Sequence, residues 1–247
     1  MSIALRPRSG VEIIDAAFQL WRSHYAQFCV LSLVACAPLF LLHVVADVNS
    51  QPFAALTAQL LSLFCNALAE ASIVVAVSDI YLGGTVNVRR ALEQTMPRVW
   101  RVISASWLRG FYVLLGFLML IVPGFLFLAQ SFATTAVVVL EPLPYAREAL
   151  ARSITLSKGM RWKILITLGL SWLLVFLLAV SARVGIADFS FDPRVDNLFT
   201  QIVFALLLPL PAVVATLLYY DARTRHEAFD LELMAQQLPP APEAHPV

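Results

Sequence analysis

Charge is scarce in this sequence. Only 13% of its 247 residues are charged, whereas 60% are hydrophobic and the mean hydropathy is +0.79. Soluble domains carry about 25% charged residues, so a chain with so few cannot cover a folded core with polar surface in water. The formal net charge is +1, which provides no broad basic field and argues against nucleic acid as a partner. Lipid is the expected solvent, and membrane lipids are the expected partners.

Residues arranged for metal binding or catalysis are also lacking. The three cysteines, Cys29, Cys36 and Cys65, lie in apolar runs without metal-ligand spacing, and we interpret them as small buried hydrophobes. The segment HEAFD, which begins at His226, lacks the second histidine of a zinc-protease motif. No G-x-S-x-G nucleophile elbow and no phosphate-binding loop occurs. We therefore expect no metal, no cofactor and no enzymatic activity.

Long apolar runs predict six membrane-spanning helices. The run 102–140 would be about 57 Å long as one helix, which exceeds the hydrocarbon thickness of about 30 Å. Val-Pro-Gly at 122–124 predicts a break that makes this run a hairpin. The expected fold is all-α and polytopic, with three helical hairpins in one membrane domain, 9–235, between a flexible N-terminus, 1–8, and a disordered Pro-rich tail, 236–247. The predicted spans are 27–46, 54–80, 102–122, 124–140, 163–184 and 198–220.

Basic residues predict the orientation of these spans. Cytoplasmic loops collect Lys and Arg. Most of the 17 basic residues precede span one, follow span six, or lie between spans two and three and between spans four and five. The connections on the opposite side carry more aspartate than arginine. Six spans place every basic cluster on one side, whereas five would divide them, so we expect both termini in the cytoplasm.

Helix-like cytoplasmic stretches precede spans one, three and five. The first has capping-box spacing at Ser9 and Glu12 and an apolar stripe through Phe18 and Tyr25, and Pro144 suits the first turn of the third. Each stretch ends in a tryptophan beside a basic residue, a pair that suits the membrane surface. These expected interface anchors are Trp21, Trp100 and Trp162. The threefold pattern is typical both of a true repeat and of helices that simply begin at a membrane surface.

Polar residues inside spans are informative because they are expensive in hydrocarbon. Span two contains Asn66 and Glu70, and span three contains Arg109. At about 1.5 Å per residue the acid and the base lie at similar depth, so we predict that Glu70 and Arg109 pair. The pair either locks the two helices together or marks a polar cavity or ion-coupling site. Prolines in spans one and six likewise predict plain kinks or carbonyls that line a cavity.

Three segments of the sequence resemble a known family. They are LIVPGFLF at 120–127, VVVLEPLPYAREALARSITLSKGMRWKIL at 137–165 and YYDARTRHEAFDLE at 219–232. Together they resemble a poorly characterised prokaryotic family of multi-pass membrane proteins, related to the membrane domain of some glycerophosphoryl diester phosphodiesterases; Ala228 stands where we expect glycine. The resemblance implies a six-span helical fold in the bacterial inner membrane and no reaction. The family-like residues are Pro123, Gly124, Glu141, Arg152, Ser153, Gly159, Tyr220, Asp221, Arg223, Glu227 and Asp230.

The segment after span six combines two tyrosines with alternating charge. We expect Tyr219 and Tyr220 at the membrane surface, which suits an apolar ring with a wet hydroxyl. Phe229 and Leu233, at helical spacing, predict that the segment docks on the membrane or on 144–158. The expected ion pairs join Arg223 or Arg225 with Glu141 or Glu148, and Asp221 or Glu227 with Arg147 or Arg152. The alternative is a solvated helix end with weak local pairs.

The sequence supports two functions. The leading hypothesis is a non-enzymatic inner-membrane protein that organises lipid or scaffolds an unidentified membrane or cytoplasmic protein partner. The alternative is a small transporter or channel with a polar site around Glu70 and Arg109. A solvent-accessible cavity that reaches Glu70 favours transport, whereas a solid bundle favours scaffolding. An intramembrane lipid enzyme is the weakest hypothesis, because the sequence shows no set of nucleophile and base.

Overall fold

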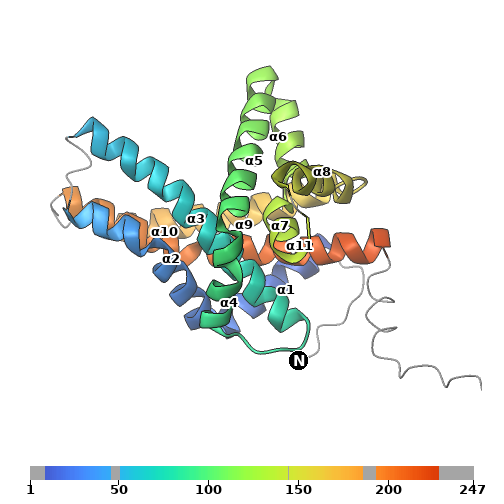
Figure 1. Ribbon diagram of the computed structural model, residues 1–247, viewed down its shortest axis with the longest axis horizontal. Helices are drawn as coiled ribbons and strands as arrows, with labels where there is room; N and C mark the ends of the chain where they lie inside the picture. The colour runs from blue at the N-terminus through green and yellow to red at the C-terminus, as the bar shows by residue number, and fades with distance from the viewer. Residues whose placement is uncertain (1–8, 46–50, 144, 186–192, 228–247) are drawn as a thin grey trace, which may run out of the picture.

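The computed structural model describes residues 9–45, 51–143, 145–185 and 193–227, and every regular element among them is a helix (Figure 1). Six helical segments in this part are long and apolar enough to cross a membrane, which is the architecture of a multi-pass membrane protein. These segments are Tyr25–Val45, Pro52–Tyr81, Val88–Met119, Ile121–Leu140, Arg161–Gly185 and Val195–Glu227. The predicted terminal segments, 1–8 and 236–247, lie outside the described residues, as does Pro144.

The helices follow one another with short connections. They are α1 (Gly10–Ser23), α2 (Tyr25–Val45), α3 (Pro52–Tyr81), α4 (Val88–Thr95), a 3₁₀ turn η1 (Met96–Arg98), α5 (Val99–Met119), α6 (Ile121–Gln130), α7 (Thr134–Leu140), α8 (Ala146–Leu156), α9 (Arg161–Gly185), α10 (Pro193–Leu207) and α11 (Pro209–Glu227).

The break between spans three and four lies earlier than predicted. A single extended residue, Leu120, separates α5 from α6, with φ −172° and ψ 162°. Pro123 and Gly124 belong to the first turn of α6 rather than to the break, because a helix tolerates proline in its first turn. Two further interruptions divide spans four and six, at 131–133 before α7 and at Leu208 before α11.

Most buried residues gather at one end of the molecule. This packed region consists of α1, residues 67–81 of α3, α7, α8 and α11, and its largest fully buried side chains include Ile13, Ile73, Phe132 and Tyr219. Small residues dominate the buried face of α3, where Ala67, Ala71 and Ala76 allow neighbouring helices to approach closely. The packed region therefore fixes the ends of several spans relative to one another.

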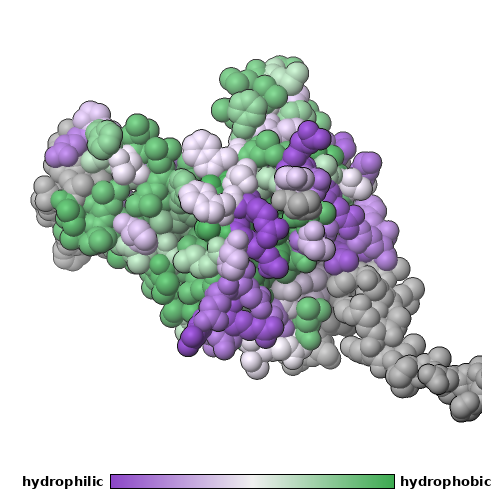
Figure 2. All heavy atoms as spheres, in the orientation of Figure 1, coloured by the Kyte–Doolittle hydropathy of each residue, from purple (hydrophilic) through white to green (hydrophobic). Residues whose placement is uncertain are grey.

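Two arms extend from the packed region (Figure 1). The first arm consists of α2, residues 52–66 of α3, and α10, and the second, the hairpin arm, consists of residues 110–130 of α5 and α6. Apolar side chains cover both arms, while polar residues gather over α4 and around α8 (Figure 2). This distribution suits arms surrounded by lipid and a packed region near water.

Helix α1 begins with the predicted start signal and packs through the face beside the predicted stripe. In α1, the Ser9 N–H donates to Glu12 Oε2 (2.7 Å) and the Glu12 N–H donates to Ser9 Oγ (3.2 Å), which is the expected capping box. The buried face of α1 carries Ile13, Ala17 and Leu20, whereas Phe18 is exposed. Helix α1 therefore packs on α9 and α11 through the face beside the predicted apolar stripe.

Candidate functional site

The predicted pair of Glu70 and Arg109 is present. Arg109 Nη1 donates to Glu70 Oε1 across 3.3 Å, which joins the middle of α3 to the middle of α5. About a quarter of each side chain is exposed (24% for Glu70 and 26% for Arg109). The prediction from equal depth is confirmed, and the two charges lie where α5 leaves the packed region to form the hairpin arm.

A large cavity lies beside this pair. It has a volume of about 640 Å³ and lies between α6, α9 and α11, with walls that include Phe125, Leu126, Leu165, Trp172 and Pro211. Among the described residues that line it, only Glu70 and Arg109 are charged. The site is therefore an apolar chamber with one anion and one cation in its wall.

A second, smaller cavity reaches the same pair from between α3 and α5. Its volume is about 300 Å³, and its lining contains Asn66 and Ser106 as well as Glu70 and Arg109. Asn66, which lies one helical turn before Glu70, thus joins the predicted polar group through this cavity. The ion pair and Leu128 are common to both cavities.

The pair is sparsely bonded. Within the described part of the chain, Arg109 and Glu70 form their one hydrogen bond with each other. A guanidinium has five N–H donors and a carboxylate about four acceptor sites, so most of this capacity remains for another molecule. The pair is therefore a single 3.3 Å contact in a partly open site.

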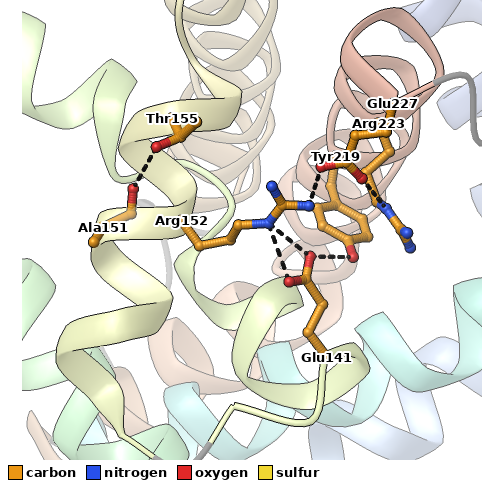
Figure 3. A network of polar contacts seen from close by, with 7 residues as sticks. All are labelled: Glu141, Ala151, Arg152, Thr155, Tyr219, Arg223 and Glu227. Atoms are coloured by element: carbon orange, nitrogen blue, oxygen red, sulfur yellow. Dashed lines mark hydrogen bonds and ion pairs between the residues drawn. The ribbon is translucent and has the colours of Figure 1, made fainter.

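A second polar cluster lies in the packed region and is densely bonded (Figure 3). Glu141, just after α7, accepts from Arg152 Nε of α8 (3.1 Å) and from the Tyr219 hydroxyl of α11 (2.9 Å). Arg152 also pairs with Glu227, which accepts from Arg223 Nε as well (2.9 Å). The Arg223 guanidinium lies 5.9 Å from the centre of the Tyr219 ring. We call these five residues the clasp network.

The clasp network stabilises the charged form of Arg152. Burial alone would lower the pKa of Arg152, but hydrogen bonds and charge attraction from Glu227 and Glu141 raise the pKa above its usual value. The predicted contact between Glu227 and Arg152 is confirmed. Arg223 bonds Glu227 within its own helix, so the predicted Arg223–Glu141 ion pair does not form, although the two charges interact. The predicted docking residues Phe229 and Leu233 lie outside the described residues.

A neighbouring group ties α9 to α11. Lys163 Nζ lies 2.5 Å from Asp221 Oδ2, and Arg225 Nε donates to the same oxygen (3.0 Å). Asp221 is only 4% exposed, so both cations serve a buried carboxylate. Lys163, rather than the predicted Arg147 or Arg152, is its partner from another helix. Arg147 is exposed.

The prediction for the two tyrosines was wrong. Tyr219 is 0% exposed and Tyr220 is 3% exposed, so their hydroxyls do not face water as predicted. The Tyr220 hydroxyl and Ser78 Oγ are 2.6 Å apart, and the Tyr220 ring stacks on Tyr81 with centroids 4.3 Å apart. Helix α11 enters the packed region at these two residues. Their hydroxyls bond the side chains of Glu141 and Ser78.

Several family-like residues have structural positions. Ser153 Oγ accepts from the Ala133 N–H (3.0 Å) and donates to the Gln130 carbonyl (2.8 Å), so it bonds both sides of the break between α6 and α7. A Cβ atom on Gly124 would lie 2.3 Å from the Phe117 ring, so a side chain here would force that ring to move. Gly159 has φ +76° in the turn before α9. Asp230 lies outside the described residues.

The predicted interface anchors differ in exposure. Trp100 and Trp162 are 74% and 73% exposed, whereas Trp21 is half-buried and packs edge-on against Tyr25 with centroids 4.9 Å apart. Sequence reasoning missed the bond from the Tyr112 hydroxyl to Gln130 Oε1 (2.7 Å), which crosses the hairpin arm. No sequence signal identifies this bond before the register of α5 and α6 is known.

Comparison with protein-family models, with curated proteins and with solved structures finds no match to this chain. The resemblance described above therefore stays a prediction. In the part of the chain that the structure describes, no three His, Cys, Asp or Glu side chains lie close enough to hold a metal ion. Assignment of a function rests on the two cavities and the groups that line them.

Proposed function

We propose that this chain is a non-enzymatic protein of the bacterial inner membrane that organises lipid by holding one amphiphilic molecule in the larger cavity. The observation that carries the proposal is an apolar chamber of about 640 Å³ with one ion pair in its wall. Ligand sites commonly enclose about 300–1,000 Å³ and combine apolar walls with a few polar groups. An acyl chain matches the walls, and a headgroup matches the pair.

The pair favours a zwitterionic headgroup. A phosphate would bond the remaining donors of Arg109, and an ammonium would bond the remaining oxygen of Glu70. A purely anionic headgroup would satisfy Arg109 but would be repelled by Glu70. The proposed occupant is therefore a membrane phospholipid that carries both charges.

The proposed orientation has three hairpins, each of which begins and ends at the cytoplasmic face. It is supported by the basic residues at the base of the hairpin arm, where Arg98 donates to the Val139 carbonyl (3.1 Å) and Arg101 to the Leu143 carbonyl (3.0 Å). In a chain whose native cysteines are replaced, Gln51→Cys should react with a membrane-impermeant maleimide from outside the cell. Glu93→Cys should react only after the cytoplasmic face is opened, and the opposite result would reverse the orientation.

The lipid proposal is tested by purification from native membranes in a mild detergent, followed by mass spectrometry of bound lipid. Glu70→Gln and Arg109→Gln remove one charge each, and Leu126→Trp fills the cavity. Arg89→Gln is a matched control, since Arg89 pairs with Glu93 on exposed α4. We expect the parent and the control to retain zwitterionic phospholipid and the three cavity variants to lose it. Equal retention in all five proteins, or none in the parent, would show that the proposal is wrong.

Transport is the second candidate, and one observation favours it. Glu70 and Arg109 line both cavities, so separation of the pair would join them. Flux of lipid or of small ions across proteoliposomes would distinguish the two functions. Flux that is present in the parent and absent in Glu70→Gln favours transport, whereas retained lipid without flux favours lipid organisation. A protein partner has weaker support, from the exposed charged surface of α4 (Figure 2).

A further inference from the structure

The turn at the end of the hairpin arm differs in composition from the turns of the other two hairpins. From residue 110 to residue 140 the sequence contains no charged residue, and the turn 117–122 reads Phe-Leu-Met-Leu-Ile-Val. The connection 46–51 contains Asp, Asn, Ser and Gln, and the connection 186–192 contains two Asp and one Ser. Two of the three turns are thus suited to water and one is not.

The side chains of this turn are largely exposed. Leu118, Leu120, Ile121 and Val122 are between 67% and 74% exposed. No described helix covers them, and the hairpin arm projects alone from the packed region (Figure 1). Leucine, isoleucine and valine side chains exposed to this extent in water would each lose about 1.5–3 kcal/mol of transfer free energy.

The backbone of the turn is also adapted to a medium without water. The Leu120 N–H donates to the Gly116 carbonyl and the Gly124 N–H donates to the Leu120 carbonyl, both at 3.1 Å. Pro123 has no N–H to satisfy. Only Leu120 leaves the helical conformation, and both its N–H and its carbonyl are bonded. Unbonded backbone groups are what normally exclude a turn from hydrocarbon.

Charge at the base of the arm sets how far its tip reaches. Arg98 and Arg101 lie at the base, where they donate to the Val139 and Leu143 carbonyls, and basic residues at this position favour the anionic phosphates of a lipid surface. From Arg101 to Leu120 a straight helix rises about 28 Å, which is less than the hydrocarbon thickness of about 30 Å. Any tilt of α5 lowers the tip further. Arg109, held to Glu70, adds a reason for the arm to stay near the side that it enters.

We propose that the hairpin arm enters the bilayer and turns back inside the hydrocarbon, so that its tip contacts acyl chains and never reaches water on the far side. Val122 and Phe125 of this arm also line the larger cavity, which therefore opens toward the bilayer interior. The proposed orientation decides only the side from which the arm enters. The depth of the tip does not depend on whether the cavity holds lipid.

Cysteine accessibility in sealed membrane vesicles of both orientations tests the depth of the tip. In the background without native cysteines, Gln51→Cys and Leu120→Cys occupy exposed positions in different turns. A membrane-impermeant maleimide should label Gln51→Cys from one side and Leu120→Cys from neither, because a thiol in hydrocarbon does not ionise. Both should be labelled after denaturation. Labelling of Leu120→Cys from outside would overturn the proposal, and so would an oxidant-induced dimer, which would place a second copy on the tip.

A charge inserted at the same two positions provides an independent test. Leu120→Lys places an ammonium in hydrocarbon if the tip is submerged, whereas Gln51→Lys adds one to a polar turn. We expect the folded yield of Leu120→Lys in membranes to fall by about tenfold or more and that of Gln51→Lys to match the parent. Equal yields would show that the tip of the hairpin arm reaches water.

Discussion

The two polar clusters of this protein use similar residues in opposite ways. Each residue of the clasp network contacts at least two others, and the network joins α8, α11 and the end of α7. Glu70 and Arg109 share one bond of 3.3 Å and face two cavities. Densely bonded charges leave little capacity for a ligand, whereas sparsely bonded charges leave most of theirs. The comparison shows that the clasp network joins helices, and it supports the proposal that the Glu70–Arg109 pair binds a ligand.

The largest expected effect on stability is at the centre of the clasp network. Arg152→Met would leave Glu141 and Glu227 partly buried without their shared cation, at a cost of about 3 kcal/mol. We expect a lower melting temperature in detergent and faster proteolysis at the C-terminal end of α11. Arg147→Met is the matched control, because Arg147 is exposed on the same helix. If the two variants melt alike, the clasp network does not stabilise the fold.

A smaller loss is expected where α9 meets α11. Lys163→Met removes the partner that Asp221 has on another helix but leaves Arg225 beside the carboxylate. We expect a cost of about 2 kcal/mol, the usual contribution of a hydrogen bond to a charged group. Lys158→Met, on an exposed residue of the preceding turn, should melt like the parent. An unchanged melting temperature for Lys163→Met would mean that Arg225 suffices for Asp221.

The break between α6 and α7 provides the next test. Ser153→Ala removes bonds to the Ala133 N–H and the Gln130 carbonyl, which would cost about 1–2 kcal/mol if no water replaces them. Thr155→Ala, whose hydroxyl bonds only its own helix, should cost less. The difference in melting temperature between the two variants measures what the Ser153 hydroxyl contributes to the break. Equal melting would show that the break needs no side chain from α8.

The smallest effect on stability is expected at the pair itself. Glu70→Gln and Arg109→Gln each break one long contact that is a quarter exposed, so we expect a cost of about 1 kcal/mol or less. Their effect on bound lipid should be larger than their effect on melting. A double variant that restores the melting temperature would instead indicate strong coupling. In that case the pair would lock α3 to α5, and the contrast with the clasp network would disappear.

Patterns along the chain predicted the features that depend on local composition or on depth. Apolar run lengths predicted the six candidate spans, and equal helical rise predicted that Arg109 meets Glu70. The break was predicted at 122–124 but lies at Leu120, because nothing in the apolar sequence before Pro123 indicates which residue leaves the helix. Proline and glycine predicted the later position, but the first turn of a helix accommodates both.

Most features that depend on packing could not be predicted. Charge alternation did predict that Glu227 meets Arg152. The burial of Tyr219 and Tyr220, in contrast, depends on how α11 enters the packed region. The partner of Asp221 was missed because Lys163 was interpreted as a headgroup anchor beside Trp162. The double role of Ser153 at the helix break had no sequence signal, since the break itself contains ordinary apolar and hydroxyl residues.

We infer that the hairpin arm tilts at the level of the interruption at 131–133, where Ser153 ties the start of α7 to α8. Gly110 lies in α5, where a side chain would meet no other atom within 4 Å, and the bond from Tyr112 to Gln130 places the interruption opposite this part of α5. Gly110 and the interruption in span four thus lie at one level, while α7 belongs to the packed region. A bilayer of different thickness would change the tilt of the arm at this level instead of straining the whole molecule. Gly110→Ala stiffens α5. The distance between spin labels on the tip and on α4 should therefore differ less between thin and thick bilayers in this variant than in the parent. Identical distance distributions in the two bilayers for the parent would show that the arm is rigid.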